Sequence, residues 1–165
     1  MKSIMTVFAF ATTLIASSFA VAHDYKVGDI SITQPWSKQV PPTSKVAAAF
    51  FDIENSAEQD DKLIAAESPI AGITELHEHT KVDGMMKMRR VEGINIPANS
   101  SEHLMPGDYH IMFFKLKRLP SLGESFPLVL YFQNAGKVEI SVKVEPADYQ
   151  SESMKKHMKG GMKHH

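Results

Sequence analysis

The sequence predicts an all-β domain, an antiparallel β-sandwich or barrel. Apolar and polar residues alternate in short runs, and Gly, Pro, Asn and Asp interrupt these runs at spacings of roughly ten residues. No stretch of the chain shows a convincing amphipathic-helix pattern. Together these features indicate roughly seven to nine short strands around one core, which suits a chain of 165 residues.

The first segment, residues 1–22, has the pattern of a secretory signal peptide rather than of the domain. Lys2 precedes an apolar run, Met5 to Ala16, and Ala20-Val21-Ala22 fits a small-x-small cleavage site. The run is shorter than the roughly 20 residues that span a bilayer, and no stop-transfer run follows, so a retained anchor is the less favoured alternative. We therefore expect export to the periplasm without stable membrane insertion.

Eight runs after residue 22 have the composition of strands, and their order along the chain defines the predicted sheet. The runs are 29–33, 46–53, 62–67, 73–80, 85–91, 109–116, 128–132 and 137–144. The Asp83-Gly84 pair is typical of a two-residue hairpin, and Asn134-Ala135-Gly136 supplies the last hairpin turn. Residues 97–101, 105–108 and 115–124 are predicted to be turns or loops.

Charge and cysteine content exclude several classes of function. The chain has 18 basic and 19 acidic residues, and this balance does not predict the basic face of a nucleic-acid-binding protein. It has no cysteine, which excludes disulfide bonds, thiolate zinc sites and blue-copper centres. We also find no Ser-His-Asp order, paired carboxylates or HExxH motif, so an enzyme is not expected.

Soft metal ligands are concentrated in residues 77–112. This stretch holds four of the eight histidines and five of the ten methionines. Imidazole and thioether groups without a thiolate suit Cu(I), whereas zinc, magnesium and calcium gain little from thioethers. The stretch therefore predicts a copper site.

Strand geometry narrows this set, because residues i and i+2 of a strand lie on one face. His110 and Met112 then share a face, with Ile111 between them directed to the core. A hairpin closed at residues 83–84 would place His77 opposite or diagonal to a methionine of the return strand, such as Met88. Three strands could thus contribute to one four-ligand site.

The spacing of these residues resembles a known family. His77, Met88, His110 and Met112 reproduce the H-x10-M-x21-H-x-M signature of PCuAC-type periplasmic copper chaperones, and the similarity extends from about Trp36 to Val144. The resemblance implies a cupredoxin-like barrel that binds Cu(I) through these four residues. It also implies delivery of copper to the binuclear copper centre of cytochrome c oxidase, with a Sco-type protein or the oxidase copper subunit as partner. We expect a monomer.

Several further residues are possible ligands. His79 adds an imidazole to the ligand face, while His103 and Met105 precede a turn. If cleavage follows Ala22, the amine and imidazole of His23 could also chelate Cu(II). We divide the mature chain into a copper-binding domain, residues 23–146, and a tail, residues 147–165.

The tail has the composition of a disordered segment, because it lacks β-branched residues and contains the Gly160-Gly161 pair. Its His and Met residues are interspersed in the manner of a metal-binding tract, and family members with such tails are associated with a second copper, often Cu(II). The possible tail ligands are Met154, His157, Met158, Met162, His164 and His165.

Two other functions remain as alternatives to a chaperone. A copper-buffering or resistance protein would carry the same ligands but would have no dedicated acceptor. An electron-transfer protein or copper oxidase is disfavoured, because the chain lacks cysteine and its soft ligands stabilise Cu(I) over Cu(II).

Overall fold

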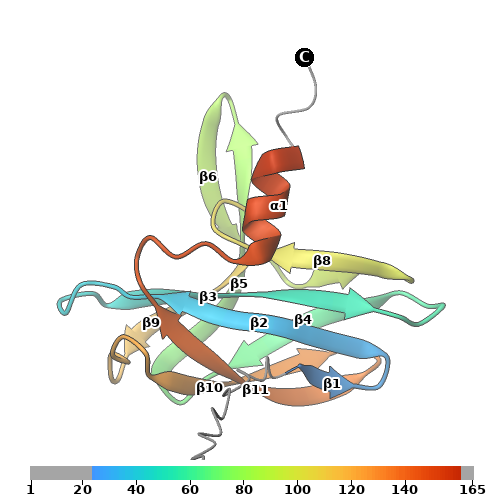
Figure 1. The fold of residues 1–165 in the computed structure, drawn as a ribbon, viewed down its shortest axis with the longest axis horizontal. Helices are drawn as coiled ribbons and strands as arrows, with labels where there is room; N and C mark the ends of the chain where they lie inside the picture. Colours follow the sequence, from blue (N-terminus) through green and yellow to red (C-terminus); the bar gives the residue numbers. More distant parts are fainter. Residues whose placement is uncertain (1–23, 161–165) are drawn as a thin grey trace, which may run out of the picture.

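The computed structural model describes residues 24–160, which form eleven strands and one helix (Figure 1). The strands are β1 (Tyr25–Val27), β2 (Ile30–Lys38), β3 (Val46–Asn55), β4 (Asp61–Glu67), β5 (Ala71–Val82), β6 (Met85–Arg90), β7 (Ile94–Ile96), β8 (Ser100–Leu104), β9 (His110–Leu116), β10 (Ser125–Phe132) and β11 (Gly136–Glu145). The helix is α1 (Glu152–Gly160). The prediction of an all-β domain is confirmed.

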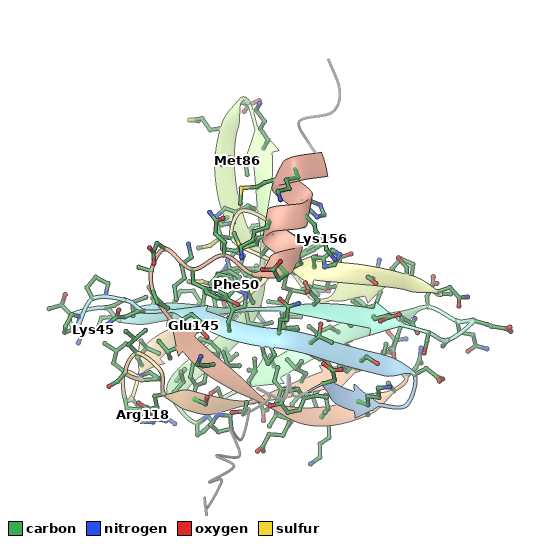
Figure 2. All side chains as sticks on the ribbon, in the orientation of Figure 1. Lys45, Phe50, Met86, Arg118, Glu145 and Lys156 are labelled. Carbon is green, nitrogen blue, oxygen red and sulfur yellow. The ribbon has the colours of Figure 1, made fainter. Side chains whose placement is uncertain are left out.

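The strands form one continuous hydrogen-bonded path in the order β6-β5-β9-β3-β2-β11-β10-β4-β7. In addition, β1 pairs with β2 and β8 pairs with β3. Within the described chain β11 runs parallel to β2, and the other pairs are antiparallel. The β5–β6 hairpin rises from the body of the domain, with the side chain of Met86 near its end (Figures 1 and 2).

All eight predicted strands are present, but three short ones were missed. β1 and β7 have only three residues each and β8 has five, too few for an alternating pattern to stand out. The prediction of a turn over residues 97–101 is wrong at its end, because Ser100 and Ser101 begin β8. At the predicted hairpin turn, Asp83 and Gly84 have φ angles of 51° and 79°, as a two-residue hairpin with positive φ at both positions requires.

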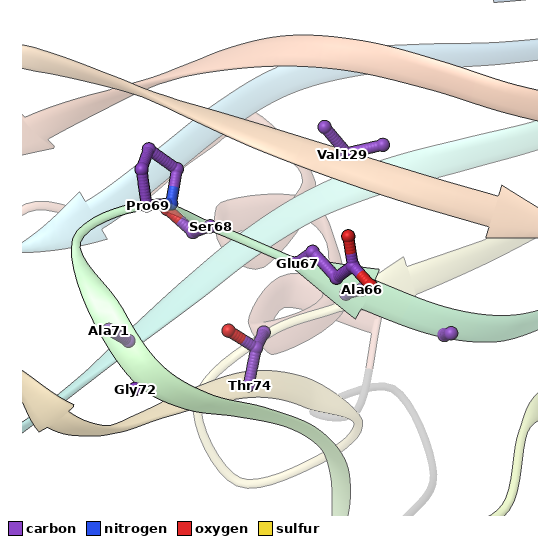
Figure 3. Close-up of a pocket in the computed structure, with 9 residues that line it drawn as sticks. Ala66, Glu67, Ser68, Pro69, Ala71, Gly72, Thr74 and Val129 are labelled. Atoms are coloured by element: carbon purple, nitrogen blue, oxygen red, sulfur yellow. The ribbon is translucent and has the colours of Figure 1, made fainter.

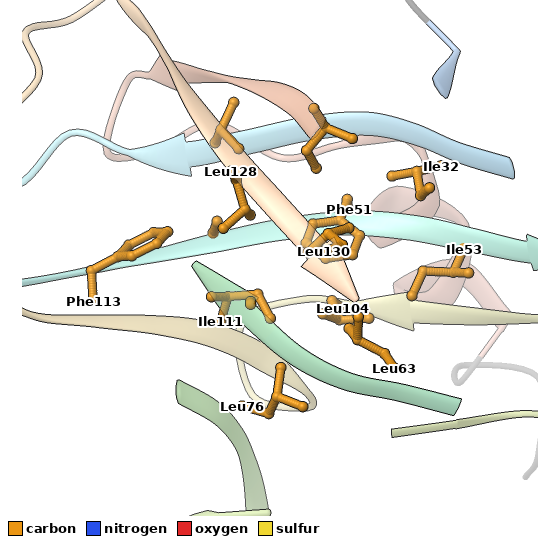
Figure 4. Packing of buried hydrophobic residues seen from close by; sticks show 14 of the residues in the cluster. Ile32, Phe51, Ile53, Leu63, Leu76, Leu104, Ile111, Phe113, Leu128 and Leu130 are labelled. Carbon is orange, nitrogen blue, oxygen red and sulfur yellow. The ribbon is translucent and has the colours of Figure 1, made fainter. Parts of the chain in front are cut away.

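One apolar core is enclosed by the curled sheet (Figure 4). Ile111 and Phe113 of β9 are fully buried in it, and Phe113 packs edge-on against Phe126 of β10 at a centroid distance of 5.5 Å. Burying one such side chain contributes about 1.5–3 kcal/mol. Because Ile111 and Phe113 are fixed inward, the alternate residues of β9, His110 and Met112, are fixed on the opposite face.

The tail departs from its prediction, because part of the segment expected to be disordered forms α1. Ser151 caps this helix: the amide of Met154 donates to its Oγ atom at 3.3 Å. Lys155 and Glu152, three residues apart, form an ion pair of 2.7 Å. Before the helix, the ring of Tyr149 packs edge-on against the ring of Trp36, with the ring centroids 4.9 Å apart. The composition of the tail did not indicate this short, capped helix.

Some predicted features lie outside the described residues: the signal peptide, His23, Met162, His164 and His165. Among the helices of residues 24–160, none is long and apolar enough to cross a membrane.

Candidate metal site

The strand register brings the four motif residues together on one face of β5, β6 and β9. His77 of β5 lies directly opposite His110 of β9, and Glu75 lies opposite Met112. On the other side of β5, His79 lies opposite Met88 of β6, so His77 is diagonal to Met88. This is one of the two arrangements expected for the hairpin, and both are within reach of long side chains.

The four side chains differ in burial. His110, His77 and Met112 expose only 3%, 7% and 9% of their surface, whereas Met88 exposes 45%. Both histidines lie on the face opposite the apolar core, and a buried imidazole generally needs a hydrogen-bond or metal partner. The site is therefore shallow, with three buried residues and one that solvent reaches.

His110 is held with one ring nitrogen directed at Met88. Its Nδ1 atom donates to the backbone oxygen of Asp108 at 2.8 Å, so Nε2 carries the lone pair of the neutral ring. That Nε2 atom lies 3.2 Å from the sulfur of Met88. Burial lowers the pKa of His110, the neighbouring His79 and His77 acting in the same direction, and this favours the neutral ring that binds metals.

His77 is oriented by a carboxylate. Its Nε2 atom donates to Glu75 at 2.7 Å, and the same carboxylate lies 3.6 Å from Arg90. The other ring nitrogen of His77, Nδ1, is buried and has no hydrogen-bond partner within the described chain. Leaving such an atom without a partner costs about 1–3 kcal/mol. A carboxylate on one nitrogen and a free lone pair on the other is the arrangement of histidines that bind metals.

Two supporting residues were missed by the sequence analysis. Glu75 and Asp108 each lie two residues before a motif histidine, and Asp108 acts through its backbone oxygen. The i, i+2 spacing on a strand could have indicated Glu75, since it shares a face with His77. The contact of Asp108 uses its backbone oxygen, which every residue has, so the residue type gives no signal for it.

The other candidate histidines of the domain lie on β5 and β8. His79 stacks on His110 at a centroid distance of 5.0 Å. His103 lies within β8, where Asp52 holds its Nδ1 atom at 2.8 Å and the ring of His157 from α1 lies 5.8 Å away. Met85 and Met86 are exposed near the end of the hairpin.

A metal ion on this face would need thioether ligands beside the imidazoles. Residues 24–160 contain no group of three or more His, Cys, Asp or Glu side chains arranged to hold a metal ion. A separate depression of about 620 Å³ between β4, β5 and β10 is lined by Ala66, Glu67, Thr74, Val129 and neighbouring small residues (Figure 3). It has no His or Met in its lining, so the motif face remains the candidate metal site.

Comparison with known proteins identifies the family of this chain. The profile of the LpqE-like family, whose description names a lipoprotein, matches residues 30–144. The chain belongs to the LpqE-like family. Relatives include the lipoprotein Lxx21020 of Leifsonia xyli, at 29% identity over 76% of this chain and 75% of that protein. Another is the uncharacterised RP573 of Rickettsia prowazekii, at 26% identity over 70% of this chain and 66% of that protein.

Solved structures of PCuAC domains share the fold of this LpqE-like chain. A copper-bound PCuAC domain from PmoF2 superposes with a TM-score of 0.65 at 27% identity, covering 75% of this chain and 98% of the domain. The Cu(I) form of DR1885 from Deinococcus radiodurans gives 0.58 at 27% identity, covering 76% and 81%. The predicted resemblance to the PCuAC family, with its cupredoxin-like barrel, is confirmed.

Proposed function

We propose that this protein is an exported copper chaperone that holds Cu(I) through His77, Met88, His110 and Met112. The observation that carries the proposal is the approach of His110 Nε2 to the sulfur of Met88 at 3.2 Å. The ring nitrogen is unprotonated in the neutral form, so two lone pairs face each other. A soft cation that both atoms bind would relieve this contact.

The ligand set favours Cu(I) over other metals. Two imidazoles and two thioethers are neutral, and hard cations gain little from sulfur ligands. The copper-bound forms of the PmoF2 domain and of DR1885 support the same choice. These ligands leave the copper ion with its own positive charge, which favours its passage to an anionic acceptor ligand over permanent retention.

The exposure of the site supports transfer rather than catalysis. Met88 is accessible, so a thiolate or imidazole of a partner can approach the copper from the side of the hairpin. The partner's ligand binds as Met88 dissociates, and copper passes across without entering solution. The soft side chains of the site suit metal binding.

The finer details of the proposal come from the family resemblance. The acceptor is a Sco-type protein or the copper-binding subunit of cytochrome c oxidase, and the protein acts in the periplasm after removal of residues 1–22. The LpqE-like description and the name of Lxx21020 both refer to lipoproteins, which supports export.

Cu(I) affinity of a double variant tests the core site. Met88→Ala with Met112→Ala should weaken Cu(I) binding at least about 100-fold, since loss of even a supporting residue of a metal site commonly costs 10–100-fold. Competition with a chromophoric Cu(I) chelator under anaerobic conditions measures this. Met86→Ala, on the same strand and exposed, is the matched control and should bind as the parent does. Parental affinity in the double variant would refute the proposed ligands.

A further inference from the structure

His79 occupies the position across the hairpin from the exposed ligand. In the register of β5 and β6 it lies directly opposite Met88, whereas His77 lies opposite Arg90. Directly opposite residues of an antiparallel pair have Cβ atoms about 4.5–5.5 Å apart, closer than diagonal ones. Of the two β5 histidines, His79 is therefore the nearer in register to Met88.

The ring of His79 also lies close to His110. The two rings are stacked with centroids 5.0 Å apart and planes inclined by 28°, whereas the rings of His77 and His110 are 6.0 Å apart and inclined by 46°. The Nδ1 atom of His79 is buried and lacks a hydrogen-bond partner within residues 24–160. A buried ring nitrogen without a partner is uncommon, because its desolvation is not compensated.

The two β5 histidines differ in access to solvent. His77 is buried and fixed by Glu75. His79 is half-buried and lies two residues nearer the hairpin turn, where Met85 and Met86 are exposed. His79 and Met88 thus lie between the exposed end of the hairpin and the buried His77 and His110.

We infer that His79 is a further copper ligand. Its imidazole binds Cu(I) together with Met88 and His110 while the metal moves between His77 and a partner protein on the solvent side. This rests on the proposed function of the core site. The step is a ligand exchange: the bond from copper to His79 Nδ1 forms as the bond to His77 breaks. No electron or proton is transferred.

The Cu(I) affinities of single and double histidine variants test whether His79 can take the place of His77 as a ligand. With His77→Ala, His79 should retain part of the binding, so adding His79→Ala should weaken the affinity by at least about tenfold more, a loss of about 1.4 kcal/mol in binding free energy. If the double variant binds as His77→Ala does, His79 is not a ligand. His79→Phe in the His77→Ala background keeps an aromatic ring against His110, and it should lose as much affinity as His79→Ala. Full retention by the phenylalanine variant would assign His79 to packing alone.

A second measurement uses the unaltered protein, so it does not depend on the folding of variants. Two-dimensional NMR of histidine ring nitrogens should show the His79 Nδ1 resonance shifting as up to one equivalent of Cu(I) is added. An unchanged His79 resonance, with His110 Nε2 shifting, would overturn the inference while leaving the core site intact. Failure of the proposed function would differ, since no histidine of the parent would then respond to Cu(I).

Discussion

Glu75 and Asp108 fix the two motif histidines through opposite ring nitrogens. Glu75 accepts from Nε2 of His77, and the backbone oxygen of Asp108 accepts from Nδ1 of His110. Each contact fixes which nitrogen is protonated, so the lone pairs that remain are Nδ1 of His77 and Nε2 of His110. The supporting contacts thereby determine which atoms the site can offer to a metal.

Replacement of Glu75 should weaken copper binding without removing a ligand. Glu75→Gln abolishes the negative charge that makes His77 a stronger donor, and we expect Cu(I) affinity to fall about tenfold, the lower end of the effect of such supporting residues. Chelator competition measures it. Glu78→Gln is the control, because Glu78 pairs with Arg89 and contacts no motif histidine in the described structure. Equal affinities of parent and Glu75→Gln would show that the carboxylate serves only Arg90.

At the scale of single elements, the β5–β6 hairpin determines which side chains face the metal. Its two-residue turn at Asp83 and Gly84 sets Val82 opposite Met85, and from this register His79 falls opposite Met88. A slip of one residue would turn every β6 side chain to the other face. The Asp-Gly signal in the sequence was strong enough to predict this hairpin and the shared face of its ligands.

The helix α1 places a second pair of histidines together. His157 of α1 lies beside His103 of β8, whose Nδ1 atom is held by Asp52, so Nε2 of His103 is left for a metal. We expect His103→Ala and His157→Ala each to weaken Cu(II) binding about tenfold, in the range found for residues that support metal sites, and to leave Cu(I) affinity unchanged. Electron paramagnetic resonance during Cu(II) titration measures this.

The control for the tail is Lys156→Ala, which alters the exposed residue next to His157 and should bind Cu(II) as the parent does. If both histidine variants retain parental Cu(II) affinity, the pair at the helix does not bind the metal. A Cu(II) site in the tail would then have to involve its other histidines and methionines.

For the molecule as a whole, the sequence predicted those features that local pattern determines. Inward Ile111 and Phe113 fixed His110 and Met112 on the opposite face, and the all-β fold followed from the same alternation. The local sequence pattern did not predict β1, β7 or α1. Strands of three residues and a helix of nine residues depend on contacts with residues distant in sequence. The edge-on contact between the rings of Tyr149 and Trp36, which are distant in the sequence, is one such contact.

The architecture also bears on whether the protein delivers copper or stores it. A buffering protein gains from burying its metal, whereas here Met88 is exposed on a hairpin that rises from the domain (Figure 1). We therefore predict that cells lacking the protein load less copper into cytochrome c oxidase when copper is scarce, and that the Met88→Ala, Met112→Ala variant fails to restore loading. The copper content and activity of the isolated oxidase measure this. Cells that differ from the parent only in sensitivity to excess copper would instead identify a buffer, because delivery to a dedicated acceptor matters most when copper is limiting.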